Sequence, residues 1–289
     1  MKLTFLGTGA SEGIPAFRCG CEICREAREK KGKNIRLNSS LLVEAGEKSA
    51  ILVDMPAHIM AAFEKYGIDE RRISAILFSH FHIDHTAGIF HLLESHKKNG
   101  HVASGVINAY MPEDLLDEII GGIFTGQAGF AGEEHKEFFS LNRLRHLEKD
   151  SSGEITFQAL DTGHLSGKAS GRPGKERECN GYLFSADGKR AACMVDSSPL
   201  LSDETLSALK GAPGEKLDCL VFECTFDSYP DSGRGHSDHE GVLRIRDLLR
   251  PSQMILTHIS HRNFGHDKLS AFMERHGIRV AWDGLSVTV

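Results

Sequence analysis

The sequence has no apolar run long enough to cross a bilayer, which takes about 20 consecutive apolar residues. Its first residues, MKLTFLGTGA, are interrupted by glycine too early for the apolar part of a signal peptide and are typical of a strand. No linker rich in proline, glycine and serine divides the chain, and no internal repeat is present. These absences predict a cytoplasmic protein without a membrane partner, folded as one domain over residues 1–289.

Basic tails and long Lys/Arg runs are also missing, and the formal net charge is -6. The charge of the chain therefore does not indicate nonspecific binding to nucleic acid, although it does not exclude a local basic patch. The seven cysteines are an odd number, and three of them lie within six residues. This pattern favours intracellular thiol or metal chemistry over a disulfide framework.

Short apolar runs typical of strands recur along the chain, with stretches typical of helices between several of them. The expected strands lie at 2–7, 39–45, 50–54, 73–79, 154–160, 181–186, 190–196, 217–223, 253–259 and 278–282. The expected helices lie at 56–67, 88–100, 113–120, 202–211 and 239–249, and several have the polar start and glycine stop that caps require. This alternation predicts an α/β layered fold.

Two glycine-containing segments, 121–135 and 165–179, have the composition of loops. The second carries four basic residues: Lys168, Arg172, Lys175 and Arg177. We interpret both segments as mobile surface loops. The alternative is that one of them covers a substrate, because site loops are often longer than simple connectors need to be.

Three histidines and an aspartate fall within six positions of the segment SHFHIDHTAG (79–88): His80, His82, Asp84 and His85. A chain of this composition would contain HxHxDH by chance about three times in a thousand. The motif directly follows the apolar run ISAILFS, so a buried strand would deliver these side chains to its carboxyl end, where α/β folds often carry their sites. We interpret it as a divalent-metal site. The alternative is a solvated, histidine-rich loop.

Single polar residues follow three later apolar runs: His164 in LDTGHLSG, Asp196 in CMVDSSP and His258 in ILTHISH. Together with HxHxDH after a strand, this order resembles the metallo-β-lactamase superfamily over nearly the whole chain. The resemblance implies an αββα sandwich of two mixed sheets with helices outside, around a dinuclear metal centre. The ligands it implies are His80, His82 and His164 for one ion, Asp84, His85 and His258 for the other, and Asp196 as the bridge. Asp54 in AILVD resembles the superfamily's aspartate that steadies the histidine loop.

A second metal motif precedes a charged helix: Cys19, Cys21 and Cys24 in FRCGCEICREAREKKG. Three thiolates can bind one soft cation, but a tetrahedral site needs a fourth ligand. We predict His261 as the fourth ligand of one structural zinc, with a disulfide or free thiols as alternatives. With the opening FLGTG and GIP, this segment is similar to the phosphoribosyl cyclic phosphodiesterase branch of the carbon–phosphorus lyase (phosphonate) pathway. The quinone-cofactor biosynthesis branch shares parts of this opening.

The predicted His/Asp ligand set has no sulfur and would accept zinc, manganese or iron. Two such cations about 3.5–4 Å apart can share a hydroxide and neutralise charge on phosphoryl oxygens, and Asp84 could orient that hydroxide. His236 in GRGHSDHEGVL resembles the catalytic histidine of related tRNA 3′-processing nucleases, so we expect a general acid or phosphate contact there. The alternative is that His236 and Asp238 only cap the following helix.

The first functional hypothesis is a metal-dependent phosphodiesterase acting on a small phosphate ester such as a phosphoribosyl cyclic phosphate. One alternative is an RNA-processing phosphodiesterase, whose phosphate contacts the basic segment 168–177 could supply. Another is a cofactor-biosynthesis protein of the same fold. Lactam or thioester hydrolysis is not excluded by the metal ligands alone. We expect a homodimer.

Overall fold

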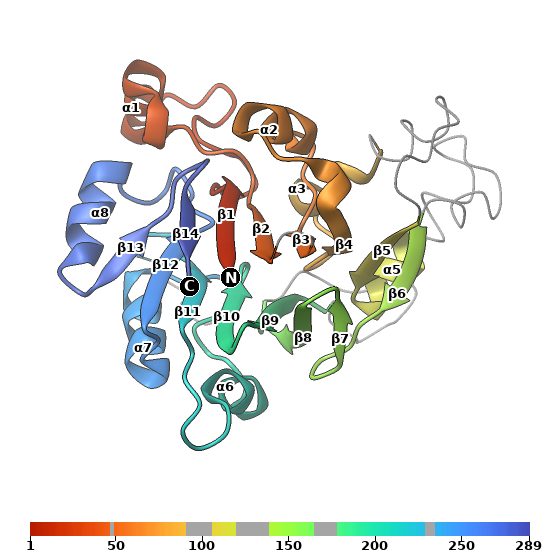
Figure 1. The fold of residues 1–289 in the computed structure, drawn as a ribbon. Coiled ribbons are helices and arrows are strands. Elements are labelled where there is room, and N and C mark those ends of the chain that lie inside the picture. Colours follow the sequence, from red (N-terminus) through yellow and green to blue (C-terminus); the bar gives the residue numbers. More distant parts are fainter. Residues whose placement is uncertain (47–48, 91–105, 120–138, 165–177, 229–234) are drawn as a thin grey trace.

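The computed structural model describes residues 1–46, 49–90, 106–119, 139–164, 178–228 and 235–289 (Figure 1). The loop predicted at 121–135, most of the loop predicted at 165–179 and most of the helix predicted at 88–100 lie outside the described residues. Within the described ranges, no helix has the length and apolar character needed to cross a membrane.

One mixed sheet contains both antiparallel and parallel pairs. Its described strands follow the order β14 (Ser286–Thr288), β1 (Lys2–Gly7), β2 (Ser40–Ala45), β3 (Ser49–Val53), β4 (Ile73–Leu77), β5 (Ile107–Met111) and β6 (Phe139–Arg143). The pairs from β14 to β3 are antiparallel, and the pairs from β3 to β6 are parallel.

The other sheet is mixed in the same way. Its described strands follow the order β13 (Ile278–Val280), β12 (Gln253–Thr257), β11 (Cys219–Glu223), β10 (Lys189–Met194), β9 (Asn180–Ala186), β8 (Ile155–Asp161) and β7 (Lys149–Ser152). The pairs from β13 to β10 are parallel, and the pairs from β10 to β7 are antiparallel.

Alternation along the strands places apolar side chains on both faces of each sheet. Leu3 and Phe5 of β1 enter the core between the sheets, whereas Leu6 enters a second core on the outer face. Helices cover both outer faces (Figure 1). Over the first sheet lie α2 (Ile59–Tyr66) and α5 (Glu113–Glu118), and over the second lie α6 (Asp203–Lys210), α7 (His239–Leu249) and α8 (His266–Glu274). The predicted αββα sandwich of two mixed sheets with helices outside is confirmed.

Glycine at the end of β1 allows two distant segments to meet. A Cβ atom at Gly7 would lie 1.9 Å from the Asn38 carbonyl oxygen, so this close approach requires glycine. Three residues beyond Gly7, the Ala10 N–H donates to the Ile259 carbonyl at 3.1 Å. The opening motif FLGTG therefore docks against the segment that follows β12, which carries two of the predicted metal ligands.

Candidate metal centre

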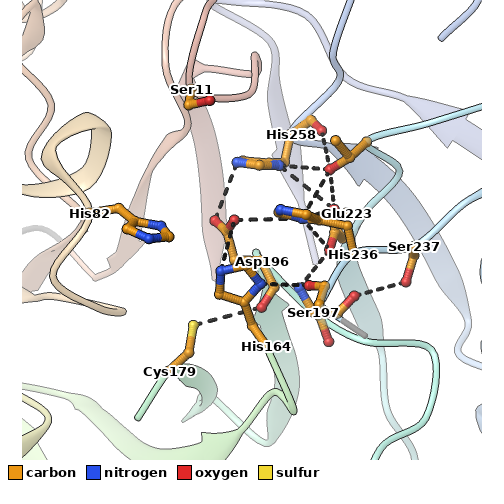
Figure 2. Close-up of polar contacts among 12 residues, drawn as sticks. Ser11, His82, His164, Cys179, Asp196, Ser197, Glu223, His236, Ser237 and His258 are labelled. Carbon is orange, nitrogen blue, oxygen red and sulfur yellow. Dashed lines mark hydrogen bonds and ion pairs between the residues drawn. The ribbon is translucent and has the colours of Figure 1, made fainter. Parts of the chain in front are cut away.

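The predicted ligands of the dinuclear centre come from separate strands but meet at one edge of the sandwich. His80 follows β4, His164 follows β8, Asp196 follows β10 and His258 follows β12, each within three residues of the strand end. Strand ends at one edge of a sheet collect polar side chains in this way. Figure 2 shows His164, His236 and His258 arranged around Asp196.

His80, His82 and His164 form the first group of facing side chains. His80 Nε2 lies 2.6 Å from His82 Nδ1, and the ring centroids of His80 and His164 are 5.3 Å apart. The Nδ1 atoms of His80 and His164 are engaged by Ser79 Oγ (3.0 Å) and the Gly235 carbonyl (2.6 Å). Burial lowers the pKa of His80 and His164, which favours the neutral imidazole that binds metals.

Asp84, His85 and His258 form the second group. Asp84 Oδ2 lies 3.1 Å from His85 Nε2. Behind this group, the buried Asp54 carboxylate accepts a hydrogen bond from His85 Nδ1 and another from the Ser79 N–H, both at 2.7 Å. Asp54 therefore fixes the His85 ring and the chain that precedes the histidine motif, which fits the supporting role predicted for it.

Asp196 lies between the two groups and turns one oxygen toward each. Its Oδ2 atom is 3.0 Å from His85 Nε2 and 3.2 Å from His258 Nε2. Its Oδ1 atom is 4.0 Å from His164 Nε2. A carboxylate in this position, only 2% exposed, is suited to bridging two cations.

Four buried atoms of this centre approach one another but make no hydrogen bond of suitable geometry to any described residue: His85 Nε2, His164 Nε2, His258 Nε2 and Asp196 Oδ2. The Nδ1 atoms of these three rings are engaged elsewhere, so each Nε2 is the ring nitrogen that can offer a lone pair. Buried lone pairs that face one another and a carboxylate are stabilised by a cation between them. The residues therefore fit a pair of divalent metal ions.

Three residues of this centre have a strained backbone. Asp54, Asp196 and His258 have φ angles of 59°, 46° and 54°, in the left-handed region. Residues other than glycine adopt this conformation at a cost of roughly 1 kcal/mol or more, and it persists only where surrounding contacts enforce it. Residues held in this way recur at functional sites.

Glu223, which the sequence analysis does not single out, supports the site from the end of β11. It is fully buried, and both of its oxygens lie 3.1 Å from His236 Nδ1. The Thr225 hydroxyl donates to Glu223 and accepts from His258 Nδ1 at 2.9 Å. Burial disfavours a charged His236, but the Glu223 carboxylate outweighs burial and raises the pKa of His236 to about 9.

The helix-capping alternative for this segment applies to Asp238 alone. Asp238 Oδ1 accepts a hydrogen bond from the Gly241 N–H at 2.9 Å, at the N-terminus of α7. His236 instead contacts Glu223 and lies 3.7 Å from Asp196 Oδ1. Its position fits a proton donor or a phosphate contact.

The centre opens into a cavity of about 380 Å³. Its walls include Ser11, Glu12, His82, Asp84, Asp196, Phe226, His236, His258 and Arg262. This volume lies at the small end of the range typical of small-molecule sites, roughly 300–1,000 Å³.

The four residues predicted to bind structural zinc also meet. His261 Nδ1 lies 3.3, 3.5 and 3.6 Å from the sulfur atoms of Cys19, Cys21 and Cys24, and none of these cysteines forms a disulfide. The opposite ring nitrogen, Nε2, is 3.4 Å from Glu12 Oε1, a carboxylate that the sequence analysis does not identify. Glu12 orients the ring so that Nδ1 faces the sulfurs. Three sulfurs and one imidazole nitrogen are a typical donor set for structural zinc.

Cys21→Ser is expected to lower the Tm by roughly 5–10 °C, because a structural zinc contributes folding energy directly. Thermal unfolding and elemental analysis of purified protein measure the two effects together. Glu22→Gln, an exposed change in the next position, is the matched control and should alter neither quantity. An unchanged Tm with undiminished zinc in Cys21→Ser would contradict the assignment.

Comparisons with known proteins agree with this fold. A family model described as a β-lactamase superfamily domain matches residues 42–259. Coenzyme PQQ synthesis protein B of Methylococcus capsulatus is 26% identical over 322 residues, covering 100% of both chains.

Two solved structures share the fold over nearly their whole length. Zn²⁺-bound PqqB from Methylobacterium extorquens has a TM-score of 0.79 at 18% identity and covers 100% of both chains. A diphosphatase from the PhnP family has a TM-score of 0.75 at 23% identity, covering 100% of this chain and 97% of the other.

Proposed function

This chain belongs to the metallo-β-lactamase superfamily, and we propose that it is a metal-dependent phosphodiesterase that cleaves a small phosphorylated ester. One observation carries the proposal: a donor set that fits two divalent cations lies beside an imidazole that a buried carboxylate supports. His236 Nδ1 is 3.7 Å from Asp196 and 3.1 Å from Glu223. Paired cations suit attack at phosphorus, and an imidazolium can protonate a departing alkoxide. The likeness to a diphosphatase also supports this chemistry.

When bound, the two cations activate water and screen the charge that develops on the phosphoryl oxygens. The residues that would hold them are His80, His82 and His164 for one, Asp84, His85 and His258 for the other, and Asp196 for both. Asp84, on the cavity wall, would also orient the attacking water. His236 would donate its proton to the leaving oxygen while Glu223 stabilises the charged imidazole.

Purified protein is expected to hydrolyse bis(p-nitrophenyl) phosphate when Mn²⁺ or Zn²⁺ is added, measured as release of p-nitrophenolate. A chelator should stop turnover, and returning the cation should restore it, because the proposed ligands hold cations that the reaction needs. The lactam nitrocefin is the matched control substrate for the other chemistry of the superfamily. Absence of diester turnover with every divalent cation would contradict the proposal.

A second candidate is a step in the synthesis of coenzyme PQQ. It is favoured by several curated relatives with that name, which match 99–100% of this chain. Expression of the chain in a bacterial strain without PQQ synthesis protein B separates the two candidates. Restored PQQ production without diester turnover would support the second candidate, and the reverse pattern would support the phosphodiesterase.

A further inference from the structure

One short segment carries ligands of both metal sites, because His258 belongs to the His/Asp centre and His261 to the cysteine site. The next residue after His258, Ile259, is paired with the N-terminal loop. Its N–H donates to the Thr8 carbonyl at 2.9 Å, and its carbonyl accepts from the Ala10 N–H at 3.1 Å. This pairing helps to hold His258 at its unfavourable φ angle of 54°. The position of Thr8 therefore affects the position of a ligand.

A buried arginine, Arg36, fixes the Thr8 side chain. Arg36 is only 3% exposed, and its Nη1 atom donates to the Thr8 hydroxyl and to the Ala281 carbonyl, both at 2.8 Å. The Thr8 hydroxyl in turn donates to Asp283 at 2.6 Å. Burial lowers the pKa of Arg36 to about 10, although the nearby Asp283 carboxylate opposes this shift. The guanidinium thus remains charged at neutral pH.

The same guanidinium holds the other end of the segment. Nη2 of Arg36 donates to Nδ1 of His266, the first residue of α8, at 3.0 Å. Because a guanidinium has no acceptor, this ring nitrogen accepts and His266 is neutral. Burial and the Arg36 charge accordingly lower the pKa of His266 to about 4. Residues 259–266, which include His261, are therefore tied to one side chain at both ends, through Thr8 at the start and directly at the end.

The backbone of Arg36 also holds the chain that leads to the cysteines. Its N–H donates to the Ile14 carbonyl at 2.8 Å, and its carbonyl accepts from the Ile14 N–H at 2.9 Å. An arginine presents a rigid, planar set of N–H donors, so a single side chain can link acceptors from separate segments, here Thr8, Ala281 and His266.

We infer that Arg36 is a positioning residue for both metal sites: it fixes the path of residues 258–266 and thereby sets the affinity of each site for its cation. No hydrogen bond joins Arg36 to a proposed ligand within the described ranges, so it acts through Thr8 and His266. Replacing a residue that orients ligands typically costs roughly 10–100-fold in metal affinity. The inference goes beyond the proposed function, because it concerns metal binding and holds for any reaction at the centre.

Arg36→Lys tests this inference, because lysine keeps the buried charge but lacks the planar donors that reach three acceptors. Metal affinities are measured by competition with a chromogenic chelator. Co²⁺ distinguishes the two sites, since thiolate ligands give it a sulfur-to-metal charge-transfer band and the His/Asp ligands do not. The folded variant is expected to bind its cations roughly tenfold more weakly at each site.

Arg190→Lys is the matched control. Arg190 is another largely buried arginine and donates to the Ala208 carbonyl at 2.7 Å, but it lies at the opposite end of β10 from Asp196. This change should alter neither affinity. A purely structural role for Arg36 would lower the Tm of Arg36→Lys and leave both affinities of the folded protein unchanged, which would overturn the inference. Weakening at only one site would overturn it as well.

Thr8→Val keeps the inference testable if Arg36→Lys does not fold. It preserves the shape of the side chain and removes the hydroxyl that Arg36 contacts. Because Thr8 acts at the start of the segment, this variant should bind cations several-fold more weakly at the His/Asp centre, and an unchanged affinity there would contradict the role of Arg36. A wild-type protein that binds its cations but cleaves no diester would overturn the proposed function alone.

Discussion

Asp196→Ala is expected to remove the catalytic cations and to slow diester hydrolysis by roughly a thousandfold or more. Its Oδ2 atom is 3.0 Å from His85 Nε2 and its Oδ1 atom 4.0 Å from His164 Nε2, so the carboxylate faces both ligand groups. Two divalent cations held side by side repel each other strongly in a buried site. Without the shared negative charge, the remaining ligands cannot offset that repulsion.

Elemental analysis and kinetics on the same preparation measure this effect. The variant should lose the cations of the His/Asp centre and keep the ion held by Cys19, Cys21, Cys24 and His261, whose ligands do not include Asp196. Asp203→Ala, an exposed change in the first turn of α6, is the matched control and should keep every ion. Full metal content in Asp196→Ala would contradict the bridging role.

Ten of the fourteen described strands were predicted, from runs that are largely apolar. The runs that become β4, β10, β11 and β12 are covered by helices on one face and by the other sheet on the opposite face, so they are nearly continuous apolar segments. The other four were not predicted: β5 (INAYM), β6 (FSLNR), β7 (KDSS) and β14 (SVT). Of these, β6, β7 and β14 lie at sheet edges, where pairing with β5, β8 and β1 decides their conformation more than their own propensity does. Strand β5 lies inside its sheet, so the edge does not explain why it was missed.

It was predictable that the proposed histidine and aspartate ligands meet, because each lies shortly after an apolar run that delivers it to the same edge. Their assignment to two ions is what the resemblance to the superfamily implies. Among the carboxylates that support the predicted ligands, Asp54 was predicted, but Glu223 and Glu12 were not. Glu223 is the last residue of an apolar strand, and Glu12 lies in a loop, so neither has a local motif. A fully buried glutamate requires a partner. The glutamate at the end of LDCLVFE could therefore be recognised as a supporting residue, but only once His236 is known to need a partner.

His236→Ala is expected to slow the hydrolysis of diesters with alkoxide leaving groups by roughly 10²–10⁴-fold. It should slow bis(p-nitrophenyl) phosphate far less. An alkoxide is too basic to depart readily without a proton, whereas p-nitrophenolate is a stabilised anion that leaves unaided. The structural reason is the 3.1 Å contact of His236 Nδ1 with Glu223, which supports the charged, proton-donating form of the ring at the cavity wall.

The measurement is the ratio of kcat for the two leaving groups, taken with adenosine 2′,3′-cyclic phosphate or another alkyl diester that the wild-type protein cleaves. Glu223→Gln keeps the shape of the side chain but removes the charge that stabilises the imidazolium, so it should shift this ratio in the same direction by a smaller factor. Glu204→Gln, exposed on α6, is the matched control. Equal losses for both leaving groups in His236→Ala would assign this ring to phosphate binding instead, since a phosphate contact serves every diester alike.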